Sequence, residues 1–145
     1  MNQADGAVSS PSGTHFTFSI LHAAKAIEDR IEGALETVGL SMAKHSALSR
    51  LEEAGEPLTL SELAERLSCV RSNITQLIDR LEADGLVRRV ADPDDRRSVR
   101  AELTPLGRER QKAGSVELAR VQQELSEQVG ASELARLESA LQSLA

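Results

Sequence analysis

The apolar residues of this chain recur at helical spacing over most of its length. From about Phe16 to Val38 they lie three or four residues apart, and Gly39 follows as a stop signal. This spacing predicts one long helix with a single apolar stripe. The residues before it, 1–15, are small, polar and interrupted by Gly and Pro, so we expect a disordered tail there.

Two shorter helices are predicted next. Ser41 can cap a helix that continues to Gly55, because a serine hydroxyl accepts from the first free backbone N–H groups of a helix. Thr59 and Glu62 have the spacing of a capping box, which predicts the start of another helix immediately after them. Both helices are short, and each has its own apolar face.

Residues 71–84 form a further predicted helix, which we call the reader helix. Its apolar positions recur at i, i+3, i+4 and i+7, and Gly85 ends it. The opposite face has short polar side chains, and the segment from Arg71 to Leu81 contains no Glu or Lys. Exposed helix faces are usually rich in both, so this pattern favours a surface that contacts a partner.

A β-hairpin and two more helices complete the predicted order. Residues 86–90 and 98–103 read as strands around the loop "ADPDDRR". Thr104, followed by Pro105 in the first turn, predicts the start of a helix that runs towards Gly130. Ser132 is expected to cap the last helix. The predicted fold is mainly α with a small β-hairpin.

Composition limits the class of protein. The chain has 145 residues, about one domain, and contains two Phe but no Tyr or Trp, so its core must be aliphatic. It has no apolar run long enough to span a membrane and no secretory signal pattern, which makes the cytoplasm the expected compartment. Cys69 is its single cysteine, so no disulfide can form within one chain.

Positive charge is concentrated in the middle of an acidic chain. The formal net charge is −6, yet residues 66–100 hold eight basic residues against six acidic ones, and all eight are Arg. Arginine suits phosphate and groove recognition because its guanidinium is planar and always charged. The segment that contains the reader helix and the hairpin is therefore the candidate nucleic-acid surface.

The arrangement of this segment fits a DNA reader. Two short helices are joined by a tight turn, and the second presents Ser, Asn, Gln and Arg side chains that can bond to base edges and phosphates in the major groove. The hairpin directly after it would form a wing. Charged hairpin tips are often only solvated, but the adjacent reader helix favours DNA binding.

The strongest block, "LIDRLEADGLVRRVADPDDRRSVRAELTPLG" at residues 77–107, resembles the MarR family of winged helix-turn-helix transcription regulators. It includes the family's wing signature, here Asp95, Arg96 and Arg97. The resemblance implies a single domain over residues 16–145. Within it, 41–103 would be the winged-helix DNA-binding lobe, while 16–38 and 104–145 would be dimerisation helices.

The resemblance also implies how the wing works. The arginine that matches Arg97 reaches into the DNA minor groove, whose negative potential favours a guanidinium, and the aspartate that matches Asp95 braces it and the wing backbone. We expect Arg80 to contact phosphate and the start of the reader helix to lie near the bases. The full predicted DNA-binding set is Arg71, Ser72, Asn73, Thr75, Gln76, Arg80, Asp95, Arg96, Arg97 and Ser98.

A homodimer is expected because apolar stripes occur at both ends of the chain, and a small lobe cannot cover both. The resemblance implies the same dimer. A two-fold axis would set the two reader helices about 34 Å apart, which corresponds to one DNA turn and a palindromic operator.

The resemblance further implies release from DNA by a small phenolic or anionic effector. Thr75 and Arg89 match positions that contact an aromatic carboxylate in some relatives, although Arg89 could equally contact phosphate or an internal carboxylate. His22 and His45 lie on helices that line pockets in the family, and they are further candidates for the ligand site. No Asp, Glu or Cys spacing completes a site around them, so we predict neither a metal nor a cofactor.

Three alternatives remain at this stage. Cys69 precedes the reader helix, so its oxidation could disturb DNA docking, although a lone cysteine usually behaves as a small apolar residue. A winged helix can also serve protein contacts, since a fold does not establish a function. An enzyme is disfavoured, because no phosphate-binding loop or nucleophile motif is present and we identify no catalytic residue.

Overall fold

The computed structural model describes residues 13–68 and 71–145, and these form six helices and three strands. Their bounds are α1 Gly13–Glu36, α2 Met42–Ala54, β1 Leu58–Thr59, α3 Leu60–Arg66, α4 Arg71–Ala83, β2 Val87–Ala91, β3 Val99–Leu103, α5 Pro105–Val129 and α6 Ala131–Gln142. The prediction of a mainly helical fold with a winged helix-turn-helix lobe is confirmed. Helix α1 begins three residues before Phe16, and most of the predicted tail lies outside the described residues.

Local capping explains where three of the helices begin. The Ser41 hydroxyl accepts from the backbone N–H of Lys44 at the start of α2, and the Thr104 hydroxyl does the same for Gly107 in α5. At α3 the capping box is complete, because Thr59 Oγ1 accepts from the backbone N–H of Glu62 at 3.1 Å and Glu62 Oε2 accepts from that of Thr59 at 2.8 Å. These predicted starts are confirmed.

The predicted start of the last helix is wrong. Gly130, with φ of 89°, occupies the position before α6, and it has no side chain that could cap the helix. Ser132 therefore lies inside the first turn of α6. The α5–α6 connection is so short that the backbone must turn at Gly130, and a positive φ favours glycine there.

A strand that the periodicity did not predict adds to the hairpin. β1 pairs with β3 in antiparallel fashion, with Leu58 opposite Ala101, and β2 pairs with the other edge of β3, with Val87 opposite Leu103. The sheet order is thus β1-β3-β2. β1 has only two residues, so it carries no alternation that could identify it in the sequence.

The buried core is aliphatic, as the composition predicts, and it lies in the winged lobe. Leu63 of α3 and Ile74 and Ile78 of α4 are fully buried, together with Leu86, which follows α4. They form one cluster with the buried faces of α2 and the sheet. The same cluster includes Leu35 of α1, so the lobe, residues 41–103, packs around this core together with the C-terminal end of α1.

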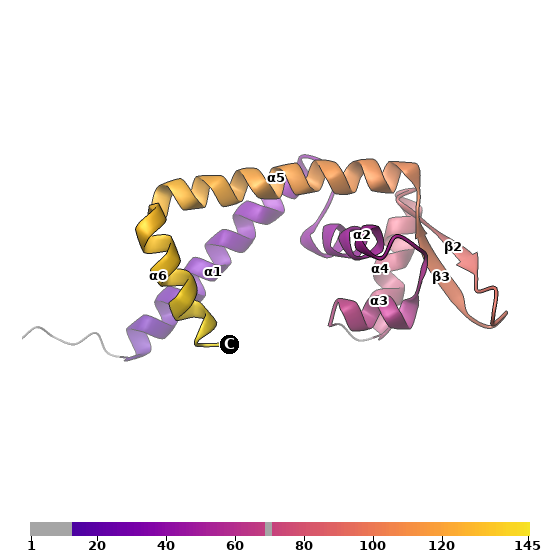
Figure 1. Ribbon diagram of the computed structural model, residues 1–145, viewed down its shortest axis with the longest axis horizontal. Helices are drawn as coiled ribbons and strands as arrows, with labels where there is room; N and C mark the ends of the chain where they lie inside the picture. Colours follow the sequence, from indigo (N-terminus) through magenta and orange to yellow (C-terminus); the bar gives the residue numbers. More distant parts are fainter. Residues whose placement is uncertain (1–12, 69–70) are drawn as a thin grey trace, which may run out of the picture.

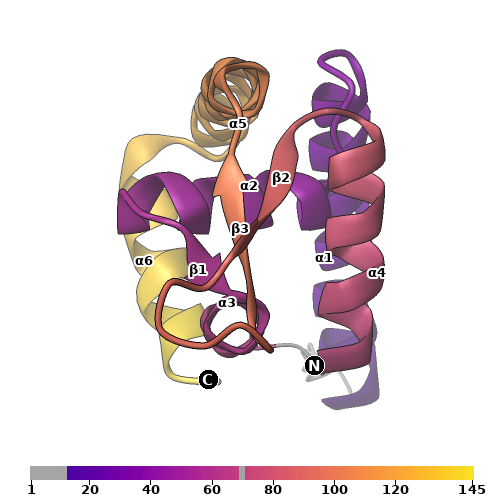
Figure 2. The same cartoon turned by 90° about the vertical axis from the view of Figure 1, so that its right-hand side faces the viewer.

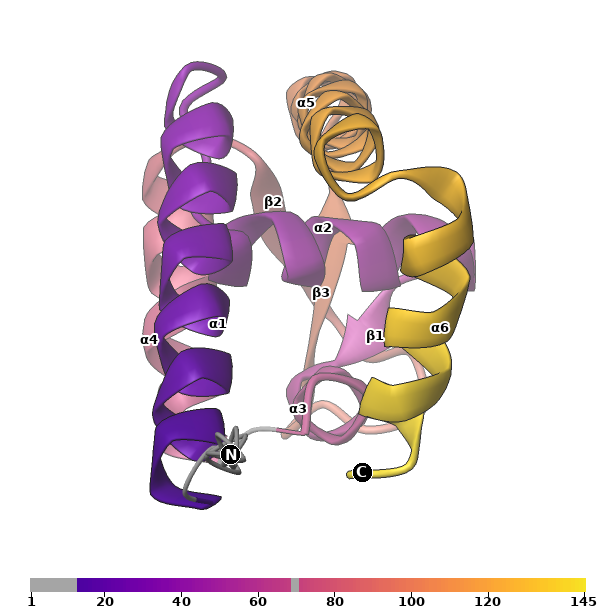
Figure 3. The ribbon, with the colours of Figure 1, turned by 90° about the vertical axis from the view of Figure 1, so that its left-hand side faces the viewer.

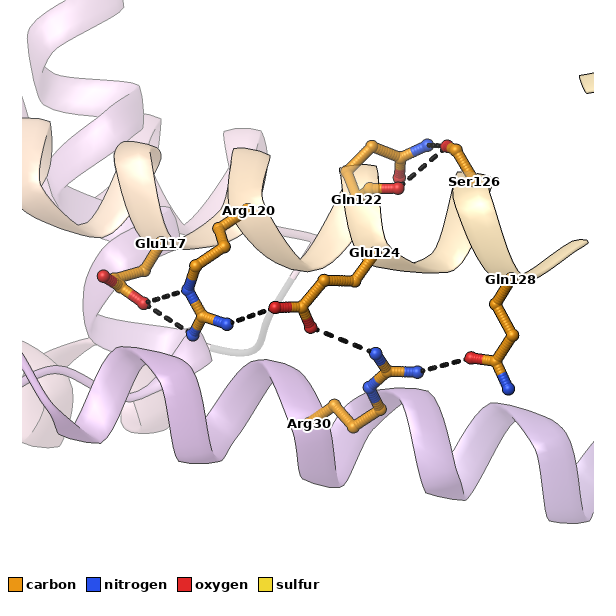
Figure 4. A network of polar contacts seen from close by, with 7 residues as sticks. All are labelled: Arg30, Glu117, Arg120, Gln122, Glu124, Ser126 and Gln128. Atoms are coloured by element: carbon orange, nitrogen blue, oxygen red, sulfur yellow. Dashed lines mark hydrogen bonds and ion pairs between the residues drawn. The ribbon is translucent and has the colours of Figure 1, made fainter. Parts of the chain in front are cut away.

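Helix α5 runs from the lobe to the far end of the molecule, where α6 turns back (Figure 1). Helix α1 packs along α5, and polar side chains join the two helices (Figure 4). Arg30 of α1 donates to Glu124 and to Gln128 of α5, each at 3.2 Å, and Glu124 also accepts from Arg120 at 2.6 Å. The hydrogen bonds from Arg120 and then Arg30 lower the pKa of the Glu124 carboxyl.

The apolar side chains of the terminal helices are largely exposed. Figure 3 shows α1 and α6 on opposite sides of α5 and apart from each other, so neither helix covers the other along its length. Phe18 on α1 is 64% exposed, and Leu137 on α6 is 45% exposed. Of the predicted stripe on α1, Leu35 is buried, whereas Ile27 near the middle of the helix is 37% exposed. Among the described residues no helix is both long and apolar enough to cross a membrane.

Candidate nucleic-acid interface

The tip of the wing, between β2 and β3, is a β-turn with two arginines at its centre. The Ser98 N–H donates to the Asp95 carbonyl at 3.0 Å, which makes Arg96 and Arg97 the central residues of the turn. The Asp95 carboxylate accepts from the Arg97 N–H at 2.9 Å. Asp95 therefore braces the backbone of the tip, and both arginine side chains are exposed.

The base of this loop is held by a buried carboxylate. Asp92 is 8% exposed, and its carboxylate accepts from the Asp94 N–H at 3.0 Å. Arg100 of β3 places Nε 3.3 Å from Asp92 Oδ2 and donates from Nη1 to the Pro57 carbonyl at 3.1 Å. The loop is thus connected both to its own strand and to the segment that precedes β1.

Helix α4 presents the predicted polar face. Asn73, Thr75, Gln76 and Arg80 are exposed, while the apolar stripe on the opposite side packs into the core. Arg71 and Ser72 lie in the first turn of α4, but their side chains are not among those described. The exposed residues carry amide, hydroxyl and guanidinium groups, which can bond to base edges and phosphates.

Some arginines of residues 66–100 form ion pairs with carboxylates, and others do not. Arg88 pairs with Glu102 across the hairpin, Arg89 pairs with Asp79 and Glu82 of α4, and Arg100 pairs with Asp92. Within the described part of the chain, the arginines of this segment that form no ion pair are Arg66, Arg80, Arg96 and Arg97. These four guanidiniums can approach a phosphate or a groove without first losing a partner.

The wing tip, α3 and the N-terminal end of α4 lie on one side of the molecule. Figure 2 shows the wing loop and α3 next to the end at which α4 begins, and Figure 1 shows the same three features below α5. The start of α4, where the predicted base-contacting residues lie, and the wing loop that holds the predicted groove-contacting arginines are therefore on the same side of the molecule. A double helix lying against that side could meet both at once.

Arg66 is a candidate contact that the sequence reasoning missed. It lies in the last turn of α3, is exposed, and faces a shallow hollow that Arg50 of α2 also lines. In the sequence, the feature that could have identified Arg66 as a contact is its position just before the turn into the reader helix. Only the tertiary fold brings α3 to the same side as the wing.

Of the predicted ligand residues, two line a common cavity. Thr75 and Arg89 border a space of about 440 Å³ between α3, α4 and the wing, together with Asp95, Arg97 and Ser98. The Arg89 guanidinium is turned towards Glu82, whose Oε1 lies 2.8 Å from Nη1. The sequence left three partners open for Arg89: an aromatic carboxylate ligand, a phosphate or an internal carboxylate. In the structure its partner is the internal carboxylate.

The two predicted histidines lie elsewhere and apart from each other. His22 lines a hollow on α1 with His15 and Phe18. His45 of α2 is 7% exposed, and its Nε2 lies 3.3 Å from Ser115 Oγ of α5. Burial lowers the pKa of His45 below its ordinary value. The structure therefore does not bring His22 or His45 to the cavity at Thr75 and Arg89.

Cys69, the predicted redox residue, lies outside the described residues. Among the residues that are described, no three His, Cys, Asp or Glu side chains come together in a way that could hold a metal ion.

Comparison with known proteins points to one family. Residues 40–99, which contain α2 to α4 and most of the wing, match the model of the MarR family. The HTH-type transcriptional regulator YsmB of Bacillus subtilis is 36% identical over 89 residues, which are 61% of this chain and 60% of that protein. The chain spans 44% to 60% of the length of the first curated relatives that it matches. These relatives are described as HTH-type transcriptional regulators, the class of protein that the sequence predicts.

Solved structures share the fold over nearly the whole chain. A mutant of MarR from Escherichia coli, complexed with operator DNA, is 24% identical and superposes with a TM-score of 0.77 over 93% of this chain and 99% of its own. CouR from Rhodococcus jostii, bound to p-coumaroyl-CoA, is also 24% identical, with a TM-score of 0.73 over 94% of this chain and 95% of its own. At this identity the likeness shows the fold alone.

Proposed function

We propose, from the match of residues 40–99 to the MarR family model, that the chain is a MarR-family regulator and a sequence-specific repressor of transcription. The observation that carries this proposal is the wing tip. Arg96 and Arg97 are exposed at the centre of a braced β-turn, and neither forms an ion pair with a described residue. The wing loop that holds them lies on the same side of the molecule as the N-terminal end of α4.

In the proposed complex, α4 lies in the major groove. Asn73 and Gln76 contact base edges, with Arg71 and Ser72 beside them, and Thr75 lies at the edge of that surface. Arg80, two turns further along, contacts phosphate, as does Arg66 of α3. Amide side chains read a base edge through a donor and an acceptor together, whereas an isolated guanidinium supplies affinity without sequence information.

The wing contacts the neighbouring minor groove. Arg97 enters the groove, Arg96 contacts its phosphate edge, and Asp95 and Ser98 hold the turn in shape. The deep negative potential of a narrow A·T-rich groove favours a guanidinium that carries no competing ion pair. Arg97 meets this condition better than Arg88, which is engaged by Glu102.

We propose that the protein acts as a homodimer on a palindromic operator. The supporting observation is the exposed apolar surface at the far end of the molecule, with Phe18 and Leu21 on α1 and Leu137 and Leu141 on α6. Exposed apolar surface of this extent is typical of an interface. A second copy packed there would repeat α4 about 34 Å away, at the spacing of one DNA turn.

A small phenolic or anionic effector would release the protein from DNA. The cavity at Thr75 and Arg89 supports this proposal, because it offers a hydroxyl and a guanidinium and is also lined by Arg97 of the wing. An anion there has to compete with Asp79 and Glu82 for Arg89. Salicylate added to the DNA titration below should therefore weaken binding by the native protein, and less so by Arg89→Ala.

The proposal is tested by selecting bound sequences from random duplex DNA and then titrating the recovered duplex against salt. The native protein should recover a palindrome and show a steep salt dependence. The variant Arg96→Gln/Arg97→Gln should lose most of its affinity and lower the log-log salt slope by about four, roughly one for each arginine that the homodimer loses.

Lys112→Gln/Arg136→Gln removes the same charge from exposed positions on α5 and α6, so it is the matched control. It should bind nearly as well as the native protein. Undiminished binding by the wing variant, or an equal loss in the control, contradicts the proposal.

A further inference from the structure

Arg89 joins the wing to the reader helix through three contacts. Its backbone N–H donates to Glu82 Oε2 at 3.0 Å, its Nη1 donates to Glu82 Oε1 at 2.8 Å, and its Nη2 contacts Asp79 Oδ1. One carboxylate thus binds both the main chain and the side chain of the same residue. We call this set, Arg89 with Asp79 and Glu82, the Arg89 clasp.

The positions of the three residues suit a rigid connection. Asp79 and Glu82 are three residues apart on α4, so they lie on one face of the helix. Arg89 is the third residue of β2 and stands opposite Ala101 at the centre of the hairpin. The guanidinium presents its donors in a fixed plane, which lets one side chain bind two carboxylates. Its side chain is 27% exposed, against 60% for that of Asp79.

A second pair on the same strand shows what is particular to the clasp. Arg88, the neighbour of Arg89, pairs with Glu102, which lies directly opposite it on β3. That pair stays within the hairpin, so it stabilises the wing without fixing where the wing stands. The clasp instead crosses from β2 to α4 and relates the wing to the reader helix.

We propose that Arg89 is a positioning residue for DNA binding, because its clasp on Asp79 and Glu82 sets the distance and angle between the wing arginines and the reader helix. This inference rests on the proposed function. A wing held in place meets the minor groove as α4 enters the major groove, so the wing loses less conformational freedom on binding.

Charge alone predicts the opposite effect for the clasp. Two carboxylates and one guanidinium sum to a net negative charge beside a surface that approaches phosphate. Neutralising the carboxylates should therefore tighten DNA binding if they have no positioning role. If the clasp positions the wing, the same change weakens binding. The sign of the change separates the two explanations.

The experiment measures the affinity of Asp79→Asn/Glu82→Gln for the duplex selected by the native protein. We expect binding to weaken on the order of tenfold, the size that follows when two arginine side chains are no longer held in place before binding. Arg89→Lys keeps the charge but loses the planar fork, so it should weaken binding in the same direction. Glu102→Gln is the matched control, because it breaks the Arg88 pair and should leave affinity unchanged or slightly higher.

A double-mutant cycle tests whether the clasp affects DNA binding through the wing arginines. In the background Arg96→Gln/Arg97→Gln, the change Asp79→Asn/Glu82→Gln should cost little further affinity, because the arginines that the clasp positions are absent. An additive loss overturns the proposal, and so does unchanged or tighter binding by Asp79→Asn/Glu82→Gln.

A measurement without DNA separates this proposal from the proposed function. Spin labels at Arg80→Cys and Asp94→Cys, in a Cys69→Ser background and diluted with an excess of unlabelled chain, report the distance between α4 and the wing tip within one protomer. The distribution should be narrow in this parent and broad when Asp79→Asn/Glu82→Gln is added, with thermal unfolding confirming that both are folded. Equal distance distributions in the two proteins would overturn the proposal that the clasp holds the wing in place. A native protein that selects no duplex while the distributions differ overturns the proposed function and leaves Arg89 as the residue that orients the wing.

Discussion

The winged lobe and the terminal helices carry the same kind of apolar periodicity, yet they bury it differently. In the lobe, Ile74 and Ile78 are fully buried within the chain. On the terminal helices, Phe18 and Leu137 are about half exposed or more. Periodicity therefore predicts an apolar face that must be covered, but it does not determine whether the same chain or another one covers it.

The largest expected effect is in the lobe core. Ile78→Ala removes a fully buried side chain from the cluster that α4 shares with α3, so it should lower the free energy of unfolding by about 2–5 kcal/mol. Denaturant unfolding at several protein concentrations measures this loss, which should be the same at each of them.

Phe18→Ala is the counterpart on the terminal helices. The side chain is exposed within one chain, so at concentrations where the protein is monomeric the change should stay within about 0.5 kcal/mol. Where copies associate, the variant should dissociate at higher concentration than the native protein in analytical ultracentrifugation. If Phe18→Ala destabilises a monomer as much as Ile78→Ala does, the two regions do not differ as described.

An effect smaller than that of Ile78→Ala is expected where the lobe meets α5. A Cβ at Gly107 would lie 1.9 Å from the Leu86 carbonyl oxygen, a backbone atom that cannot move aside. Gly107→Ala should therefore push α5 away from the lobe and cost about 1–3 kcal/mol, as overpacking generally does. Thermal unfolding measures the loss, and an unchanged midpoint would show that α5 does not pack on Leu86.

Gly33→Ala is the matched change on α1. No atom lies within 4 Å of a Cβ at this position, so alanine should stabilise the helix by about 0.5–1 kcal/mol. A loss of stability that grows with protein concentration would instead place Gly33 against a second copy. The sign of the change in the free energy of unfolding thus tests whether this part of α1 is exposed or covered in the assembly.

The smallest expected effect concerns pH at the α2–α5 contact. Burial lowers the pKa of His45 in the folded protein, so the unfolded chain takes up its proton at a higher pH. Stability should then fall as the pH drops through about 6.5, the ordinary pKa of histidine, and the loss should stop below the folded pKa. Denaturant unfolding between about pH 7 and about pH 5 should show a shallower decline for His45→Gln. Parallel profiles for the two proteins would contradict this account.

Features that depend on neighbours in the sequence were predictable. The caps at Ser41, Thr59 and Thr104 involve residues within three positions of each other. The Asp95 brace at the wing tip also spans only two residues, but it was expected from the family resemblance. Such patterns are complete within a short window. The exposed polar face of α4 was predictable for the same reason, since a helix fixes which residues share a face.

Features that depend on packing were not predictable. β1 exists because Leu58 meets Ala101, a partner more than forty residues away. The sequence left Arg89 with three possible contacts, and the choice of Glu82 and Asp79 follows from how β2 lies against α4. Arg66 is a candidate for the interface only because α3 folds to the side of the wing tip.

By itself, the sequence determined the order of helices and hairpin, most of the caps, the aliphatic core and the concentration of arginine in one segment, because each depends on local spacing or on composition. Tertiary structure alone decided which of those arginines are engaged by carboxylates, where a two-residue strand forms and which apolar faces stay uncovered. The physical reason is that ion pairs, strand pairing and burial are relations between residues distant in the chain, and these exist only once the helices and strands have packed.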